Sequence, residues 1–183
     1  MQSQFSDAEN VAPGIKLSGY NTLFAGNEKL QNLWFHSFSL QYMNFNSFNF
    51  SNFNANLSYQ RSFDAITNSV VFTELEQVLT PINATGINDN WRFSAFYEKR
   101  FRKFKTGLES EVNYFTTNNT IDGNDNENQN FTQRYQVSVE TNFKKGPNAE
   151  LGYEMQNNFF AGNVSASRFV QDSPFVRIEV PFF

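Results

Sequence analysis

The chain of 183 residues contains no cysteine and a single histidine, His36. The lack of cysteine excludes disulfides and thiolate chemistry, and it leaves the compartment undecided. A catalytic triad that uses histidine, or a histidine-rich metal site, would have to use His36. No partner that could orient this side chain is visible in the sequence, so His36 is expected to be an interfacial strand residue. The sequence therefore predicts no catalytic residue, no metal site and no cofactor, and hence no enzyme.

Long apolar runs and basic blocks are also absent. A transmembrane helix needs about 18 or more consecutive apolar residues, and no such run occurs. Lys and Arg total 14 against 18 Asp and Glu, for a net charge of −4, so there is no electrostatic case for a nucleic-acid partner. Residues 1–4, Met-Gln-Ser-Gln, form neither the basic nor the apolar region of a secretory signal. Either a signal has been removed or the chain is a piece of a longer one, and we expect the second.

Aromatic residues are abundant in a chain that is polar as a whole. Phe alone contributes 23 residues, while the mean hydropathy is −0.54. This pairing suits a membrane β-barrel, in which alternate residues of each strand face lipid and water.

The clearest pattern lies between Asn130 and Phe160. From Phe131 to Phe143 apolar and polar residues alternate, and after a short turn at 144–148 the alternation resumes from Ala149 to Gln156. A β-strand sends successive side chains to opposite sides, so each run has one apolar and one polar face. Runs of about ten residues are long for soluble strands and match transmembrane strands.

Similar alternation predicts about seven firm strands. Besides the two strands of this hairpin, they begin near residues 33, 53, 87, 104 and 174. The predicted fold class is all-β, an antiparallel transmembrane β-barrel, with this chain forming a segment of about 7–8 strands of a larger barrel. Residues 1–32 are predicted to be an N-terminal loop or extended segment, and residues 33–183 to hold the barrel strands.

The connections between the predicted strands alternate in length. Those near Ser47, Arg102 and Gly146 are short, whereas Asn68–Asn90, Asn118–Asn130 and Ala161–Ser167 are longer and more polar. Short periplasmic turns and longer extracellular loops are the arrangement expected of outer-membrane barrels.

Strand parity assigns side chains to the two sides of the predicted wall. The apolar parity predicts contact with lipid for Phe53, Leu57, Tyr59, Phe93, Tyr97, Leu108, Val112, Tyr114, Tyr135, Val137, Val139, Leu151, Tyr153, Ile178 and Val180. The opposite parity predicts a position in the lumen for Arg92, Lys105, Glu109, Glu111, Arg134, Glu140, Glu150, Glu154 and Arg177.

Two groups of polar residues allow a chemical interpretation and a structural one. The lumen carboxylates could in principle do acid–base work, but cross-strand ion pairs or contacts to a plug explain them better. The acidic stretch Asp122–Glu127 could offer oxygen ligands to a hard cation, but its spacing does not match a 12-residue calcium loop, so a solvated loop is expected.

Four stretches resemble the barrel of TonB-dependent outer-membrane receptors of the Bacteroidetes type. They are LFAGNEKLQNLWFHSFSLQY from Leu23, WRFSAFYEKRFRKFKTGLESEVNY from Trp91, NFTQRYQVSVETNFKKGPNAELGYE from Asn130 and SPFVRIEV from Ser173. The resemblance implies a barrel of about 22 strands closed by an N-terminal plug. This chain has no plug and no energy-coupling box, so it is similar to an internal or near-C-terminal barrel segment.

The resemblance implies a location in the outer membrane of a Gram-negative bacterium and a part in TonB-dependent substrate uptake. The implied partners are outer-membrane lipid, the remaining barrel strands and plug in the same or a second chain, a surface lipoprotein and the TonB energy-coupling system. One alternative is a self-contained small outer-membrane barrel with a structural or adhesive role. Another is a soluble lipid- or sugar-binding β protein. The sequence leaves the substrate undetermined.

Overall fold

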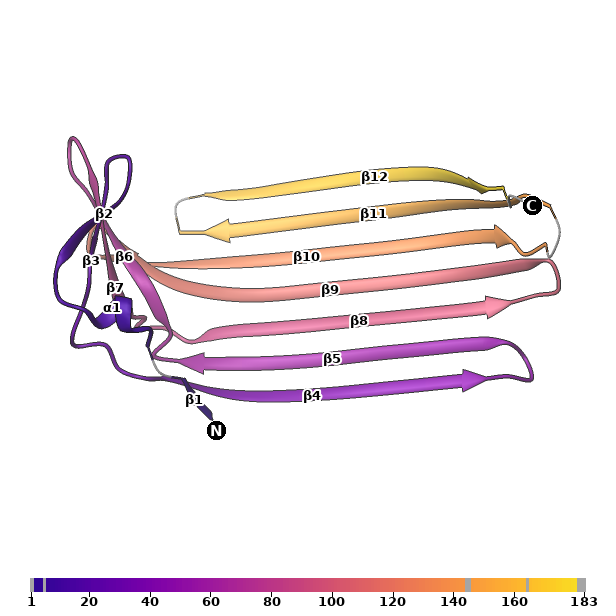
Figure 1. Cartoon of the computed structure of the whole chain (residues 1–183), viewed down its shortest axis with the longest axis horizontal. Helices are drawn as coiled ribbons and strands as arrows, with labels where there is room; N and C mark the ends of the chain where they lie inside the picture. The colour runs from indigo at the N-terminus through magenta and orange to yellow at the C-terminus, as the bar shows by residue number, and fades with distance from the viewer. Residues whose placement is uncertain (1, 5, 144–145, 164, 181–183) are drawn as a thin grey trace.

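The computed structural model describes the whole chain apart from residues 1, 5, 144, 145, 164 and 181–183. It is almost entirely β, as the sequence predicts, and its 12 strands belong to one sheet (Figure 1). The helix among the described residues, α1 (Ala8–Val11), has four residues. Lys144 and Lys145 of the predicted turn lie outside the described residues.

Seven long strands form the main part of the sheet. They lie side by side in chain order, and every neighbouring pair is antiparallel. Each has between 13 and 18 residues, in keeping with the long alternating runs of the sequence. They are β4 (Leu33–Asn46), β5 (Ser51–Phe63), β8 (Asn88–Arg100), β9 (Phe104–Ile121), β10 (Asn124–Thr141), β11 (Asn148–Gly162) and β12 (Ala166–Glu179).

Four short strands form an end module beside the long ones. They are β2 (Ile15–Gly19), β3 (Thr22–Ala25), β6 (Ile66–Phe72) and β7 (Gln77–Asn83). Their order runs from β9 through β6, β7 and β3 to β2. Two of these pairings, β3 with β7 and β6 with β9, are parallel, so the prediction of a wholly antiparallel sheet is wrong here. The module lies at one end of the long strands (Figure 1).

The long polar loop predicted at Asn118–Asn130 is instead a hairpin. The pairing of β9 with β10 continues until Ile121 stands opposite Asn124, and only Asp122 and Gly123 form the turn. Both turn residues have positive φ, 47° and 78°. Asp-Gly favours this type of tight turn, and its effect outweighs the polar composition of the flanking residues.

The last strand also begins earlier than predicted. Pro174 was expected near its start, but β12 begins at Ala166 and Pro174 lies within it, opposite Tyr153. Proline is tolerated there because β12 is an edge strand with one ladder partner. The second predicted strand, expected to reach Ile66, ends at Phe63, and β6 begins at Ile66.

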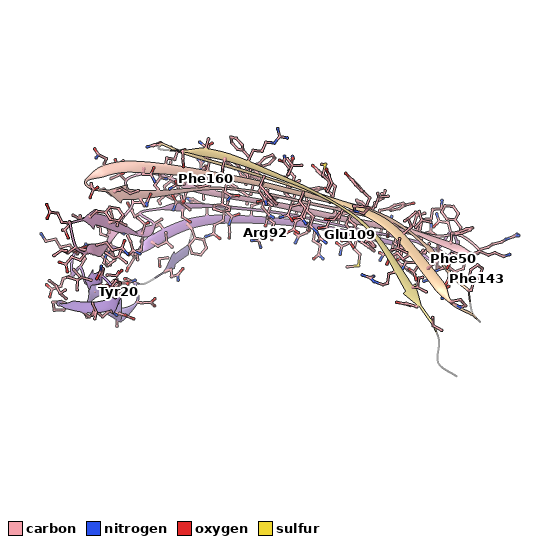
Figure 2. The ribbon with its side chains drawn as sticks, turned by 90° about the horizontal axis from the view of Figure 1, so that it is seen from above. Tyr20, Phe50, Arg92, Glu109, Phe143 and Phe160 are labelled. Atoms are coloured by element: carbon pink, nitrogen blue, oxygen red, sulfur yellow. The ribbon has the colours of Figure 1, made fainter. Side chains whose placement is uncertain are left out.

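The sheet is open rather than closed into a barrel. Its long strands end at β4 on one side and at β12 on the other. Figure 2 shows the sheet bent into an arch, with Arg92 and Glu109 on its inner side.

Buried apolar side chains are scarce in the described part of the chain. They are Ala65, Ala84 and Pro81, all in or next to the end module. Large apolar residues of the long strands stay exposed, for example Leu40 at 57% and Leu151 at 64%. A soluble sandwich would bury such side chains between two layers, and large exposed apolar patches mark interaction surfaces. The question of function is therefore what these exposed faces contact.

Candidate functional site

The register of the long strands sorts their side chains onto two faces. Residues directly opposite each other in antiparallel strands point to the same side of a sheet. One lateral row, opposite pair by opposite pair, consists entirely of aromatic residues from β4 to β11: Phe38, Tyr59, Trp91, Tyr114, Phe131 and Phe159. We call the side of this row the apolar face and the other side the polar face.

The residues predicted to contact lipid lie together on the apolar face. The ladders connect all of them except Val180, which follows the last residue of β12 and is 59% exposed. For example, Phe53 stands opposite Tyr97, which stands opposite Leu108, which in turn stands opposite Val137. Contact with lipid itself stays a prediction.

Charged residues on the apolar face are confined to its margins. On β4, β5 and β8 to β11 they occur only near strand ends, at Arg61, Asp89, Lys99, Asp125 and Glu127. Between these positions the face carries mostly aromatic, aliphatic and small uncharged side chains, together with the amides of Gln133 and Asn157, which are hydrogen-bonded to each other at 3.2 Å. A zone without charged residues, with the charges near strand ends, is typical of a surface that crosses hydrocarbon.

This zone runs obliquely across the sheet. On β4 the apolar residues extend from Trp34 to Tyr42 and give way to Asn44 and Asn46. β12 shows the opposite distribution. The charged residues Arg168 and Asp172 lie in its first part, and the apolar residues Pro174, Val176 and Ile178 follow. The row of Phe38 ends at Arg168, whereas the row of Val176 leads back to Asn46. We call this oblique zone the apolar band.

The slope of the apolar band gives the tilt of the strands against it. On β4 the centre of the band is Phe38. On β12 the centre is Val176, which stands in the same lateral row as Asn46 of β4. The centre therefore shifts by eight residues over six steps from strand to strand. With about 3.3 Å per residue and about 4.8 Å between strands, this shift corresponds to a tilt of about 40°. Strands of transmembrane barrels are tilted by about 35–45° against the membrane normal.

An aromatic and ionic cluster lies at the margin of the apolar band that is nearest to the end module. The rings of Tyr59 and Trp91 are 4.1 Å apart between centroids. Asp89 accepts hydrogen bonds from the Tyr59 hydroxyl at 2.8 Å and from Arg61 Nε and Nη2 at 2.8 and 2.9 Å. The bidentate ion pair neutralises both charges at this margin, where aromatic side chains with polar atoms are also favoured at a membrane interface. Parity with Tyr59 and Trp91 could have indicated this cluster, but the sequence prediction missed it.

His36 lies on the apolar face, in line with its predicted interfacial position. Its ring packs edge-on against Phe63, with centroids 5.7 Å apart. The register places it opposite Arg61. Among the described residues, no group of three His, Asp or Glu side chains is arranged to hold a metal ion, and this includes the described Asp122–Glu127 stretch.

All nine residues predicted for the lumen lie on the polar face. One lateral row crosses β9 to β12 as Lys105, Glu140, Glu150 and Arg177. Lys105 Nζ lies 2.9 Å from Glu140 Oε2, and Arg177 Nη1 lies 2.8 Å from Glu150 Oε2. These pairs offset the repulsion between Glu140 and Glu150, which stand directly opposite each other.

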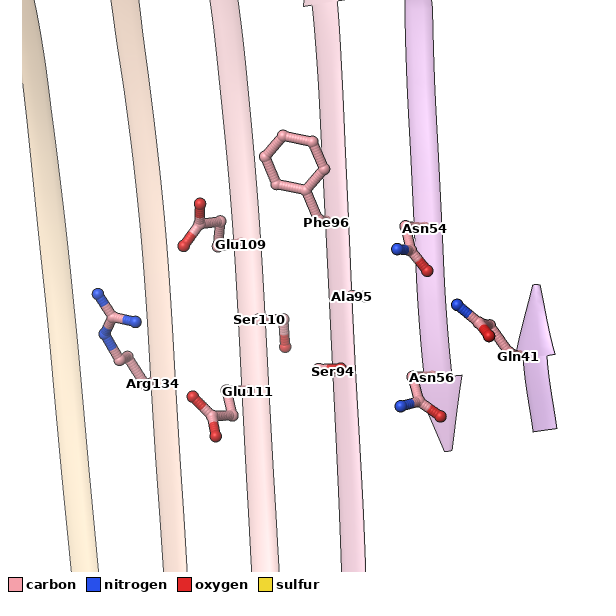
Figure 3. A pocket seen from close by; sticks show the side chains of 10 residues that line it. All are labelled: Gln41, Asn54, Asn56, Ser94, Ala95, Phe96, Glu109, Ser110, Glu111 and Arg134. Carbon is pink, nitrogen blue, oxygen red and sulfur yellow. The ribbon is translucent and has the colours of Figure 1, made fainter. Parts of the chain in front are cut away.

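A cavity of about 280 Å³ opens on the polar face near the middle of the long strands (Figure 3). Its lining includes Glu109, Glu111 and Arg134, and the guanidinium of Arg134 donates a hydrogen bond of 2.9 Å to Glu154 on β11. The amides of Gln41, Asn54 and Asn56 line the opposite side. Carboxylates and amides in such a wet groove can bind polar groups or cations.

Phe175 lies on the polar face of β12, and Phe96, Phe115 and Phe160 lie on the same face of their strands, so phenylalanine is not confined to the apolar face. The ring of Phe175 covers the backbone of Gly152 on β11, where a Cβ would overlap the ring. Arg177 lies over the same ring at 5.9 Å. Glycine covered by an aromatic ring across a strand pair stabilises local register.

No family model matches the chain, and no curated protein or solved structure matches it either. Within the described residues, no helix has the length and apolar character needed to cross a membrane.

Proposed function

We propose that the chain forms part of the wall of a larger outer-membrane β-barrel, a receptor or transporter for TonB-dependent uptake. The apolar band is the observation that carries this proposal. It combines a zone without charged residues and a slope that corresponds to tilted strands, and the aromatic row crosses it. Its residues contact lipid, and the paired charges of the polar face line the lumen or contact a plug.

Receptor and uptake activity rest on the sequence resemblance, with the polar face in support. The ion-pair row and the amide-lined cavity give this face the polar character of a barrel lumen. At the end of the sheet where the end module lies, only the connection from β5 to β8 is long, and it contains β6 and β7. The connections from β9 to β10 and from β11 to β12 are short, so the longer loops predicted at Asn118–Asn130 and Ala161–Ser167 are wrong. We assign the extracellular side, where substrate is captured, to the end with the long β5–β8 connection.

A self-contained barrel made of the seven long strands is less favourable. β4 and β12 run in the same direction, because an even number of antiparallel steps separates them. Direct closure of β4 on β12 would therefore make a parallel pair, whereas the known transmembrane barrels of bacteria pair their strands antiparallel. Further strands are needed on at least one side.

The proposal is tested by placing cysteine at Glu109, Glu140 or Glu154, each of which becomes the only thiol of the chain. In lipid nanodiscs these thiols are expected to react with a small, water-soluble thiol reagent that can enter the lumen. Leu108, Val139 and Tyr153 supply neighbouring controls on the apolar face, which should react in detergent but be protected by lipid.

The opposite pattern would overturn the assignment of the two faces. Labelling of both faces in the presence of lipid would contradict insertion of the sheet. Flotation of the chain with vesicles is measured first, so that a failure to bind membrane is recognised separately from a wrong orientation.

A further inference from the structure

The outer edge of β4 is occupied only at one end. There, β1 (Gln2–Gln4) pairs antiparallel with Leu33–Phe35, with Gln2 opposite Phe35. Along the rest of β4, from His36 to Asn46, the outer edge has no ladder partner among the described residues. β1 thus marks both the direction and the register of a strand on this edge.

We infer that the edge of β4 is a strand-addition site whose occupant is an amphipathic segment continuous with β1. This inference rests on the proposed function and names the neighbour on one side of the wall. The occupant runs antiparallel to β4 and leads into Gln2. Its apolar residues fall opposite Phe38, Leu40 and Tyr42, and its polar residues opposite Ser37, Ser39 and Gln41.

The composition of β4 supports an edge that is paired rather than left free. Soluble proteins protect edge strands with charged residues, proline or bulges, since a bare edge aggregates. β4 contains no proline and no Lys, Arg, Asp or Glu, and its pairing with β5 runs without a bulge. β12, the other edge, contains Arg168, Asp172 and Pro174.

The apolar band requires the partner to be a β-strand with matching alternation. Phe38, Leu40 and Tyr42 are each more than half exposed and bring the band to the edge of the sheet. In hydrocarbon, every unpaired N–H and C=O group costs several kcal/mol, so the edge groups in the band need ladder partners. A residue opposite Phe38, Leu40 or Tyr42 faces lipid and is therefore apolar.

A second copy of the chain fits this edge poorly. If both copies have their end modules on the same side of the membrane, β12 of the second copy would pair with β4 of the first copy in parallel. The β4 edge of the second copy would pair antiparallel only through a two-fold axis, which places the end modules on opposite sides of the membrane. Outer-membrane barrels keep their long loops on one side, so a segment continuous with β1 satisfies direction and orientation together.

The test adds a strand of roughly ten residues directly before Met1, with its length set by the register of β1 along Ser37–Asn46. In the matching variant, leucines stand second, fourth and sixth before Met1, opposite Phe38, Leu40 and Tyr42, and serines and threonines fill the other positions. The shifted control carries one additional serine between this strand and Met1, which turns every leucine to the polar face.

The measurement is amide hydrogen exchange in detergent micelles at those residues of His36–Asn46 whose N–H points away from β5, which is every second residue of an antiparallel strand. Exchange in the matching variant is expected to be about tenfold slower, or more, than in the unextended chain, with little change in the shifted control. Equal protection by both variants, no protection by either, or slow exchange of these amides in the unextended chain would each overturn the inference. An association of the unextended chain that protects these amides would identify a second copy as the occupant.

Vesicle flotation of the same variants separates this inference from the proposed function. Slow exchange in micelles without flotation would retain the strand-addition site and contradict the membrane role. If the variants float with vesicles but the matching and shifted variants protect the β4 amides equally, the membrane role is retained and the strand-addition site is contradicted.

Discussion

Replacement of Val137 by Arg is expected to destabilise the bilayer-inserted protein by about 2–4 kcal/mol, the cost of Arg near the midplane on the lipid face of a barrel. Val137 lies near the centre of the apolar band on β10, between Leu108 and Tyr153 on the neighbouring strands. No carboxylate on the apolar face stands opposite it to offset the charge. Arg substitutions of Leu57 and Val112, which lie within the same band, are expected to be similarly unfavourable. Chemical denaturation of protein refolded into bilayers measures the loss.

Gln136→Arg is the matched control for Val137→Arg, since it places the same side chain one residue away on the polar face. The register places Gln136 opposite both Glu109 and Glu154, so the new guanidinium gains carboxylate neighbours. Its stability is expected to stay close to that of the unsubstituted protein. Wild-type stability of all three apolar-face variants would contradict the assignment of this face to lipid.

Gly26→Ala is expected to detach the segment before β2 from the end module. A Cβ at this position would overlap the carbonyl oxygen of Ala12, a backbone atom that cannot turn away. Gly26 N donates to Gly14 O at 3.2 Å, and Asn27 N donates to Asn10 O at 2.8 Å, so the two chain segments are in direct contact. Overpacking of this kind costs about 1–3 kcal/mol and occasionally more. Faster exchange of the backbone amides of residues 26 and 27 measures the loss.

Gly19→Ala is the control within the same module, because the nearest atom to its added Cβ would be Thr22 Cβ at an ordinary 3.8 Å. We expect this variant to keep the exchange rates of the unsubstituted chain. The long strands should retain their stability in both variants, since the contact of Gly26 lies outside them. Unchanged exchange at Asn27 in Gly26→Ala would show that the contact with Ala12 is not formed in solution.

Side-chain parity was the part of this fold most accessible to sequence reasoning. Alternation is a local property, and every strand that it indicated is present in the sheet. It sorted residues such as Tyr59 and Arg134 onto opposite faces because a regular strand has a strict period of two. The sequence prediction did not include Arg61 and Asp89, although they share the parity of Tyr59 and Trp91, and their pairing became visible only when β5 and β8 were found side by side.

Sequence reasoning could not supply the lateral arrangement of the strands. Alternation within one strand carries no information on register against a neighbour, so the slope of the apolar band was not predictable. The parallel pairing of β6 with β9 joins Val70 to Ile121 across a long stretch of chain, and no local signal marks such a contact. The Asp122-Gly123 hairpin did have a local signal, which was outweighed by the amides and acidic residues around it.

The oblique apolar band is the central feature of this account, and one pair of variants tests it most directly. Leu40 on β4 and Val170 on β12 end the same lateral row of the apolar face, but the band includes Leu40 and excludes Val170. In bilayers, Leu40→Arg is expected to cost about 2–4 kcal/mol and Val170→Arg about 0–1 kcal/mol, the value near the interface. Equal losses of stability in the two variants, or a larger loss in Val170→Arg, would contradict a membrane-spanning sheet with strands tilted by about 40°.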